Sequence, residues 1–224
     1  MHGAHSAKPA TKAVLFDLDG TLADSAPDMA RALNAIRAVR KLPPLPVKEV
    51  RPHVSRGARG MLTVGFNMNS EHADYAAMRD EFLDHYERHL CIDTRLFDGM
   101  DSLLQSLERS GIEWGVVTNK ARRFALPLLA TMKLDQRAAC IVCGDTTPHT
   151  KPHPEPLLHA LRELGLPASA AWYVGDDERD IQAARAANMR SLAARYGYIG
   201  TGAPPEAWRA DGIVDSAEEV LAFL

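Results

Sequence analysis

Short apolar runs alternate along the chain with stretches in which apolar residues recur at helical spacing. The runs, rich in Val and Ile, cover residues 13–16, 114–117, 139–142, 172–174, 192–194 and 212–214. Two of the helical faces between them are Met100, Leu103, Leu104, Leu107 and Leu157, Leu158, Leu161, Leu164. Apolar strands separated by amphipathic helices are typical of a parallel sheet covered on both faces. The pattern therefore predicts an α/β fold with a doubly wound parallel sheet.

One connection is too long for this alternation. About seventy residues separate the first run from the next core helix, whereas a usual strand-to-helix loop has two to six. This stretch has helical faces of its own, and residues 43–46, Pro-Pro-Leu-Pro, predict a turn between two helices. We expect a helical cap domain at residues 24–94, inserted into a core formed by residues 1–23 and 95–224.

Composition limits the classes of partner. The chain has 224 residues, 46% of them hydrophobic and 25% charged, and a formal net charge of −3. This balance predicts a globular protein without the field that attracts nucleic acid or anionic membranes, and it leaves a small-molecule partner open. We expect a monomer or homodimer. Residues 1–12 lack the apolar run of a secretory signal, and no later stretch has the apolar length that a bilayer requires. We therefore expect a cytoplasmic protein with an irregular N-terminal segment.

Three cysteines, Cys91, Cys140 and Cys143, are too few and odd in number for a disulfide framework. Cys140 and Cys143 form a C-x-x-C within residues 138–143, a run that predicts one strand. Side chains three residues apart on a strand point to opposite faces, which favours core packing over a redox pair.

Four polar motifs each follow an apolar run. They are Phe16-Asp17-Leu18-Asp19-Gly20-Thr21, Val117-Thr118-Asn119-Lys120, Lys151-Pro152-His153-Pro154 and Val174-Gly175-Asp176-Asp177-Glu178-Arg179-Asp180. In open α/β sheets ligands bind outside the carboxyl ends of the strands, so these loops are expected to meet in one crevice.

The carboxylates of Asp17, Asp19, Asp176, Asp177 and Asp180 would raise one another's pKa unless a cation neutralised them. Mg²⁺ suits such a site, because it binds a few carboxylates together with water and substrate phosphate. Lys151 and the Thr118 hydroxyl offer the positive charge and the donor that a transferring phosphoryl group requires. We expect a magnesium-dependent phosphate site.

The order D-x-D-G-T, a strand-ending Thr, a Lys before Pro and G-D-D-x-x-D resembles the haloacid dehalogenase superfamily over nearly the whole chain. The resemblance implies that Asp17 is the nucleophile and that Asp19 acts as general acid and then base. It also implies that Mg²⁺ is bound by the Asp17 side chain, the Asp19 backbone carbonyl and Asp176. Asp177 and Asp180 would tune the metal through its ligands or contact it directly.

The remaining expected contacts are with the substrate. Gly20 would leave room for the phosphoryl oxygens near the backbone, and Thr21 and Asn119 belong to the same phosphate-binding motifs. Residues 51–59 form a basic cluster in the cap, which could be either a solvated charged turn or a substrate contact. Within it, Arg59 and Arg56 are expected to reach toward a substrate carboxylate.

His149 and His153 flank Lys151. We expect them to be surface loop residues, because a phosphoaspartate mechanism requires no histidine.

The presence of Asp19 favours phosphoryl transfer, because dehalogenases of the superfamily lack this second aspartate. The cap resembles that of the phosphoglycolate phosphatase branch. Residues 57–59, 81–83, 114–120 and 195–199 look especially similar to bacterial N-acetylmuramic acid 6-phosphate phosphatases. Both 2-phosphoglycolate and N-acetylmuramic acid 6-phosphate stay open as substrates. The alternatives are a sugar-phosphate mutase of the β-phosphoglucomutase type, which shares all four motifs, and a non-catalytic phosphate-binding module.

Overall fold

The computed structural model describes residues 10–224. The irregular segment expected at residues 1–12 lies outside this range except for its last three residues. The strands are β1 Ala13–Phe16, β2 Ala23–Asp24, β3 Arg95–Leu96, β4 Glu113–Val117, β5 Ile141–Val142, β6 Ala171–Gly175, β7 Arg190–Ala194 and β8 Gly212–Val214. The α-helices are α1 Ala26–Val39, α2 Val47–Val50, α3 Gly57–Phe66, α4 Tyr75–Arg88, α5 Met100–Arg109, α6 Arg122–Thr131, α7 Glu155–Leu164 and α8 Glu178–Ala186. Short 3₁₀ helices cover Arg51–Arg56, Ala168–Ala170, Pro205–Ala207 and Glu218–Phe223.

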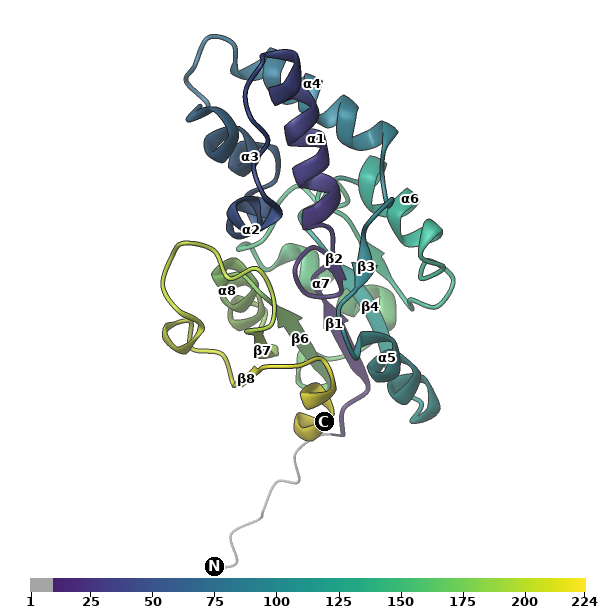
Figure 1. Cartoon of the computed structure of the whole chain (residues 1–224). Coiled ribbons are helices and arrows are strands. Elements are labelled where there is room, and N and C mark those ends of the chain that lie inside the picture. Colours follow the sequence, from purple (N-terminus) through teal and green to yellow (C-terminus); the bar gives the residue numbers. More distant parts are fainter. Residues whose placement is uncertain (1–9) are drawn as a thin grey trace, which may run out of the picture.

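A six-stranded parallel sheet forms the core, with strand order β5-β4-β1-β6-β7-β8 (Figure 1). Residues of β1 alternate between its two faces: Val14 and Phe16 pack with α5 and α6, and Ala13 and Leu15 pack with α7 and α8. All four side chains are fully buried, which explains why the strand is apolar throughout. The predicted α/β fold with a doubly wound parallel sheet is confirmed.

The strand predicted at residues 138–143 is shorter than expected. β5 covers only Ile141–Val142 and lies at the sheet edge, where β4 is its single partner. Cys140 and Cys143 therefore flank the strand, and they pack into different apolar clusters as free thiols. Burial raises the pKa of Cys140 to about 12, so this thiol is a poor nucleophile.

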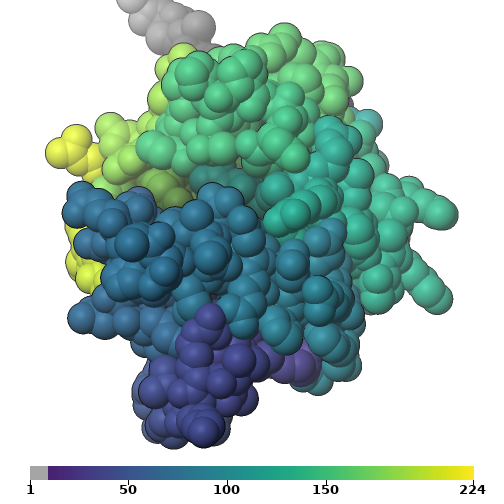
Figure 2. Space-filling model, turned by 90° about the horizontal axis from the view of Figure 1, so that it is seen from above, coloured from purple at the N-terminus to yellow at the C-terminus, as the bar shows by residue number. Residues whose placement is uncertain are grey.

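Helices α1 to α4 stand beyond the sheet and share a hydrophobic cluster that includes Met29, Leu33, Phe82 and Tyr86 (Figure 1). The two-stranded antiparallel ribbon of β2 and β3 lies between these helices and the sheet, and we call the part between the two strands the cap. Residues 51–59, a turn in one sequence interpretation, are instead a 3₁₀ helix followed by the start of α3. Viewed from above, the blue part of the cap lies directly against the green part of the core (Figure 2). Within residues 10–224 no helix is long and apolar enough to cross a bilayer.

Candidate active site

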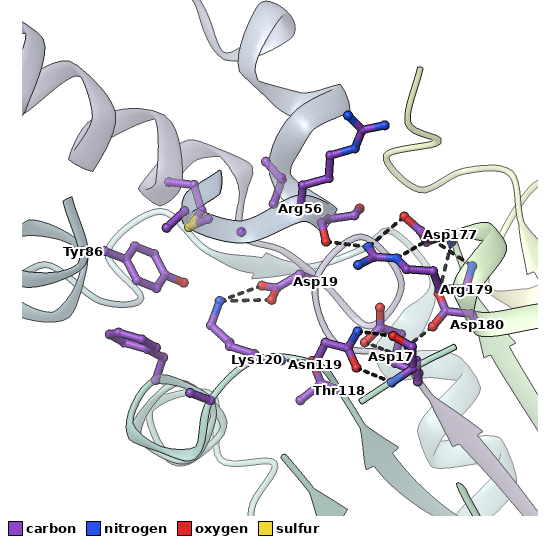
Figure 3. Close-up of a pocket in the computed structure, with 18 of the residues that line it drawn as sticks. Asp17, Asp19, Arg56, Tyr86, Thr118, Asn119, Lys120, Asp177, Arg179 and Asp180 are labelled. Carbon is purple, nitrogen blue, oxygen red and sulfur yellow. Dashed lines mark hydrogen bonds and ion pairs between the residues drawn. The ribbon is translucent and has the colours of Figure 1, made fainter. Parts of the chain in front are cut away.

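The four polar motifs meet beneath the cap. β1 is flanked by β4 and β6, so the loops that follow these strands lie at the point where the strand order reverses. Asp17, Thr118, Lys151 and Asp180 line one cavity of about 330 Å³, together with side chains from the cap (Figure 3). The crevice expected from the strand ends is therefore present.

Asp17 follows the last residue of β1. Its backbone N–H donates to the Val174 carbonyl at 2.9 Å, and its Oδ1 accepts from the Leu18 N–H at 2.7 Å. The same oxygen lies 2.9 Å from Lys151 Nζ. The carboxylate is thus oriented at the cavity wall with a cation beside it.

Three carboxylates form a cluster that could hold a metal ion. One oxygen from each of Asp17, Asp176 and Asp180 lies within 4.8 Å of the other two. Burial, together with the charges of Asp17 and Asp180, raises the pKa of Asp176 well above its ordinary value. Burial also raises the pKa of Asp180 to about 7, although Lys151 opposes this effect. Such crowded acids are stabilised in their ionised form by a hard cation, and the all-oxygen donor set fits Mg²⁺.

Lys151 is 3% exposed and links two of these acids. Its Nζ lies 2.9 Å from Asp17 Oδ1 and 2.6 Å from Asp180 Oδ1, and it also donates to the Val117 carbonyl at 3.0 Å. Burial would lower the pKa of Lys151, but the charges of Asp17 and Asp180 outweigh it and raise the pKa. Lys151 is therefore a buried cation next to the Asp17 carboxylate.

The carboxylate of Asp19 is not in the acidic cluster. Both of its oxygens lie 3.0 Å from Lys120 Nζ, and Oδ1 also accepts a hydrogen bond from the Ser25 hydroxyl. Asp19 lines the cavity on the side where the cap begins. Asp17 and Asp19, which are separated by one residue, thus have different partners and can have different chemical roles.

The second motif supports this arrangement. The Asn119 amide donates to the Lys151 carbonyl and its oxygen accepts from the Lys151 N–H, both at 2.9 Å, so Asn119 fixes the loop that carries the lysine. Thr118 is 3% exposed, and its Oγ1 accepts from the Lys120 N–H at 3.1 Å. Both residues line the cavity.

Three expected substrate contacts do not line this cavity. Gly20 has φ +91°, and a Cβ there would lie 2.2 Å from Asp176 Oδ2, so the missing side chain makes room for a carboxylate. The Thr21 hydroxyl donates to Asp176 Oδ1 at 2.9 Å. Arg59 is exposed and lines a neighbouring cavity, whereas Arg56 lines both. Gly20 and Thr21 thus act on the position of Asp176.

Asp177 caps the N-terminus of α8 rather than joining the acidic cluster. Its side chain accepts from the Arg179 N–H at 3.0 Å, and Asp180 accepts in return from the Asp177 N–H at 3.1 Å, which forms a capping box. Although burial opposes it, the hydrogen bonds from Arg179 lower the pKa of Asp177. The Arg179 guanidinium also donates to the Ser55 carbonyl of the cap at 2.6 Å.

Sequence reasoning missed several residues of the site, including Tyr198. Its N–H donates to Asp176 Oδ2 at 3.0 Å, and its hydroxyl accepts from the backbone N–H groups of Ser25 and Ala26 at 2.7 and 2.9 Å. The tyrosine therefore joins the acidic cluster to the first turn of α1. The only signal in the sequence was its position in the 195–199 stretch. Lys120 and Arg179 lay inside the motifs, but nothing in the pattern gave them partners.

Comparisons with known proteins identify the same family that the four motifs resemble. The sequence profile described as haloacid dehalogenase-like hydrolase matches residues 14–194. The chain is 43% identical over 213 residues to an N-acetylmuramic acid 6-phosphate phosphatase from Pseudomonas aeruginosa, covering 95% of this chain and 94% of the relative. It is 47% identical over 212 residues to a phosphoglycolate phosphatase from Xanthomonas campestris pv. campestris, covering 93% and 94%.

A solved structure has the same architecture. The crystal structure of a predicted phosphoglycolate phosphatase from Haemophilus somnus superposes with a TM-score of 0.83 at 27% identity, covering 95% of this chain and 97% of the other. The profile match spans most of the chain, and both relatives exceed 40% identity over nearly their full length. The resemblance in the motifs is confirmed, and the chain belongs to the haloacid dehalogenase-like hydrolase family.

Proposed function

We propose that this protein is a magnesium-dependent phosphatase that hydrolyses a small phosphorylated metabolite through a phosphorylated Asp17. The observation that carries the proposal is the position of the Asp17 carboxylate, at the cavity wall and 2.9 Å from the buried Lys151 ammonium. A bound phosphoryl group would meet a nucleophile and a cation at the same place. The names of the relatives, all phosphatases, support the same reaction class.

In the proposed first step an Asp17 oxygen attacks phosphorus while the bond between phosphorus and the ester oxygen breaks. Asp19 gives its proton to the leaving oxygen, and the metabolite departs as an alcohol. Lys151 offsets the charge that gathers on the phosphoryl oxygens, and Thr118 supplies a hydroxyl donor at the same wall.

In the second step Asp19 removes a proton from water as the water oxygen attacks phosphorus. The bond from phosphorus to Asp17 breaks, which releases inorganic phosphate and restores the carboxylate. Asp17 and Asp176, with the Asp19 backbone carbonyl, would hold Mg²⁺, and Asp180 is a further possible ligand because its oxygen belongs to the cluster. When bound, the ion supplies charge stabilisation to the phosphoryl group.

The cavity favours a substrate larger than a two-carbon acid. Its volume is about 330 Å³, and Met29, Leu83 and Phe124 give it apolar walls. Pockets of this size accept whole small ligands rather than a phosphate alone. N-acetylmuramic acid 6-phosphate, with its ring and acetyl group, would fill this space, and the P. aeruginosa relative carries the name of this substrate. The X. campestris relative keeps 2-phosphoglycolate as the second candidate.

The test is a phosphate-release assay on both metabolites and on p-nitrophenyl phosphate, with Mg²⁺ and with EDTA. We expect turnover of at least one metabolite only with Mg²⁺ and without a bisphosphate activator. A requirement for such an activator would favour the mutase alternative, and no phosphate release from any ester would refute a phosphatase.

A further inference from the structure

We propose that Lys120 and Tyr86 form a recognition site for a carboxylate on the leaving-group half of the substrate. The inference rests on the proposed phosphatase function, but it concerns the residues that select the substrate and leaves the phosphoryl chemistry unchanged. Lys120 follows β4 in the core, and Tyr86 lies on α4 in the cap. The proposed site thus spans the boundary between the two parts.

Lys120 is a buried cation at the cavity wall. Its side chain is only 8% exposed, and its Nζ lies 3.0 Å from both oxygens of Asp19 and 4.7 Å from the centre of the Tyr86 ring. Burial would lower the pKa of Lys120, but the charge of Asp19 outweighs it and raises the pKa. An ammonium has three N–H donors, and two of them are directed at the oxygens of Asp19. A donor is left for a ligand.

Tyr86 contributes a second donor. The residue is 2% exposed, and its hydroxyl has no hydrogen-bond partner within the part of the chain that the structure describes. The ring lines the cavity, and the hydroxyl points toward Lys120 and Asp19 (Figure 3). Burial raises the pKa of Tyr86 to about 12, so the group stays a neutral O–H donor. A buried hydroxyl without a partner is costly, and a bound ligand would remove this cost.

The position of the Lys120 and Tyr86 donors determines which half of the substrate they would contact. Asp19 is the proposed acid for the leaving oxygen, and Lys120 contacts its carboxylate directly. The ammonium therefore lies beside the leaving group, on the cap side of the cavity. Two donors set against apolar walls suit an acceptor group that carries negative charge, because the remaining N–H of the ammonium and the Tyr86 hydroxyl would otherwise lose hydration without an acceptor.

The arginines near the site are less suited to this role. Arg179 already binds Asp177 and the Ser55 carbonyl. The Arg56 guanidinium points away from Asp17 and Asp19 (Figure 3). Arg59 lines the neighbouring cavity. Lys120 and Tyr86 are thus better placed than the cap arginines to contact a carboxylate on the leaving-group half of the substrate.

The experiment compares esters with and without a carboxylate. The pairs are N-acetylmuramic acid 6-phosphate with N-acetylglucosamine 6-phosphate, which lacks the whole lactyl ether that bears the carboxylate, and 2-phosphoglycolate with ethyl phosphate, in which a methyl group replaces the carboxylate. We expect Lys120→Met to lower kcat/KM for the carboxylate member on the order of 10- to 100-fold more than for its partner, the range of a charged hydrogen bond. Tyr86→Phe removes one oxygen and is expected to give a selective loss of roughly 3- to 10-fold.

Two substitutions outside the cavity serve as matched controls. Tyr75→Phe changes a tyrosine at the start of the same helix α4, and Lys48→Met removes an exposed lysine of the cap. Neither residue lines the cavity, so both variants should keep the wild-type ratio between the members of each pair. Inhibition by inorganic phosphate should be unchanged in Tyr86→Phe, because the phosphoryl site is intact.

Equal losses on both members of a pair, in Lys120→Met and in Tyr86→Phe, would overturn the inference and leave Lys120 acting only on Asp19. A wild-type enzyme that hydrolyses both members equally well would overturn it too, while the phosphatase proposal would stand. If wild type released no phosphate from p-nitrophenyl phosphate or any metabolite, the proposed function itself would fail. Tyr86→Phe keeps the ring, so it gives a result even if Lys120→Met does not fold.

Discussion

Arg179 and Ser55 connect the core to the cap: the guanidinium of Arg179 on α8 donates to the Ser55 carbonyl at 2.6 Å. The same guanidinium is held by the Asp177 carboxylate, with Nε 2.8 Å from Oδ1. Arg179 lies between Asp177 and Asp180 in the last motif, and it thus binds the cap at Ser55. Both Arg179 and Ser55 line the cavity.

We expect Arg179→Ala to loosen the cap, because the Ser55 carbonyl loses its donor from the core. Hydrogen exchange of the segment 51–66 should become faster, and KM for the metabolite should rise roughly 5- to 20-fold with a smaller change in kcat. The control is Arg185→Ala, which removes an exposed arginine of the same helix. Unchanged exchange in the Arg179 variant would show that this contact does not hold the cap.

Asp17→Asn is expected to abolish phosphate release while the thermal midpoint stays close to that of wild type. The amide keeps the shape of the side chain but cannot attack phosphorus. Asp19→Asn should retain a low rate, reduced by ~10²–10⁴-fold, because it loses proton transfer but keeps the nucleophile. Steady-state assays of both variants provide the measurement. Near-normal turnover of the Asp17 variant would contradict the covalent mechanism.

Lys151→Ala should reduce the rate far more than His153→Ala. Lys151 is buried against Asp17 and Asp180, whereas His153 is exposed and stacks on His149 with ring centres 4.1 Å apart. We expect a loss on the order of 10²-fold or more in kcat for the lysine variant, and less than about threefold for the histidine variant. Similar losses of rate in both variants would mean that Lys151 is not the residue of this loop that stabilises the charge of the phosphoryl group.

Removing Lys151 should also lower the free energy of unfolding, by about 3–5 kcal/mol in metal-free buffer, because two buried carboxylates lose their cation. Urea unfolding of Lys151→Ala with and without Mg²⁺ measures this effect. We expect Mg²⁺ to restore part of the loss, since it would neutralise the same acids. No difference between the two conditions would contradict a metal at this cluster.

Mg²⁺ should stabilise the protein more at pH 8 than at pH 6. The pKa of Asp180 is raised to about 7, so below this pH a proton competes with the ion for the acidic cluster. In the metal-free protein the effect of pH on stability is the opposite: the contribution of Asp180 to the free energy of unfolding falls as pH rises. A raised folded-state pKa means that the folded protein binds more protons than the unfolded chain, so this group destabilises as pH rises from about 4 to 7.

Thermal melts at both pH values, with and without Mg²⁺, test this prediction. Asp180→Asn is the matched variant, because it removes the titrating group while keeping its size. The Asp180→Asn variant should show a rise in melting temperature on addition of Mg²⁺ that depends less on pH than in wild type. A shift of equal size at pH 6 and pH 8 in wild type would exclude Asp180 as the controlling group.

The parts of this molecule that follow from local pattern were predictable. β1 has the predicted bounds, and Met100, Leu103, Leu104 and Leu107 of α5 are all fully buried, because the 2.0 and 3.6 periods specify which side chains share a face. The acids after β1 and β6 were located because ligand sites form at strand ends. β5 was harder, since an edge strand with one partner can end early without leaving a gap in the sheet.

Contacts between distant segments could not be read from the sequence. Tyr198 binds Ser25, which lies 173 residues earlier, and Lys120 binds Asp19, which lies 101 residues earlier. Neither pairing produces a periodic signal along the chain. Arg59 was assigned to the substrate because it is basic and lies in the cap, yet the direction of a side chain depends on the helix that carries it. Its expected role in substrate choice stays a prediction.

The β2–β3 ribbon has a consequence for how the protein can change over evolutionary time. Ala23 pairs with Leu96 and Asp24 with Arg95, so the two points where the chain crosses between core and cap are direct neighbours. A segment anchored at two adjacent points can grow, shrink or be replaced while its anchor spacing stays constant. The entropic cost of a longer insertion rises only with the logarithm of its length. Where the insertion contacts the substrate, as proposed above, substrate range can diversify through it while the strands of the sheet keep their register.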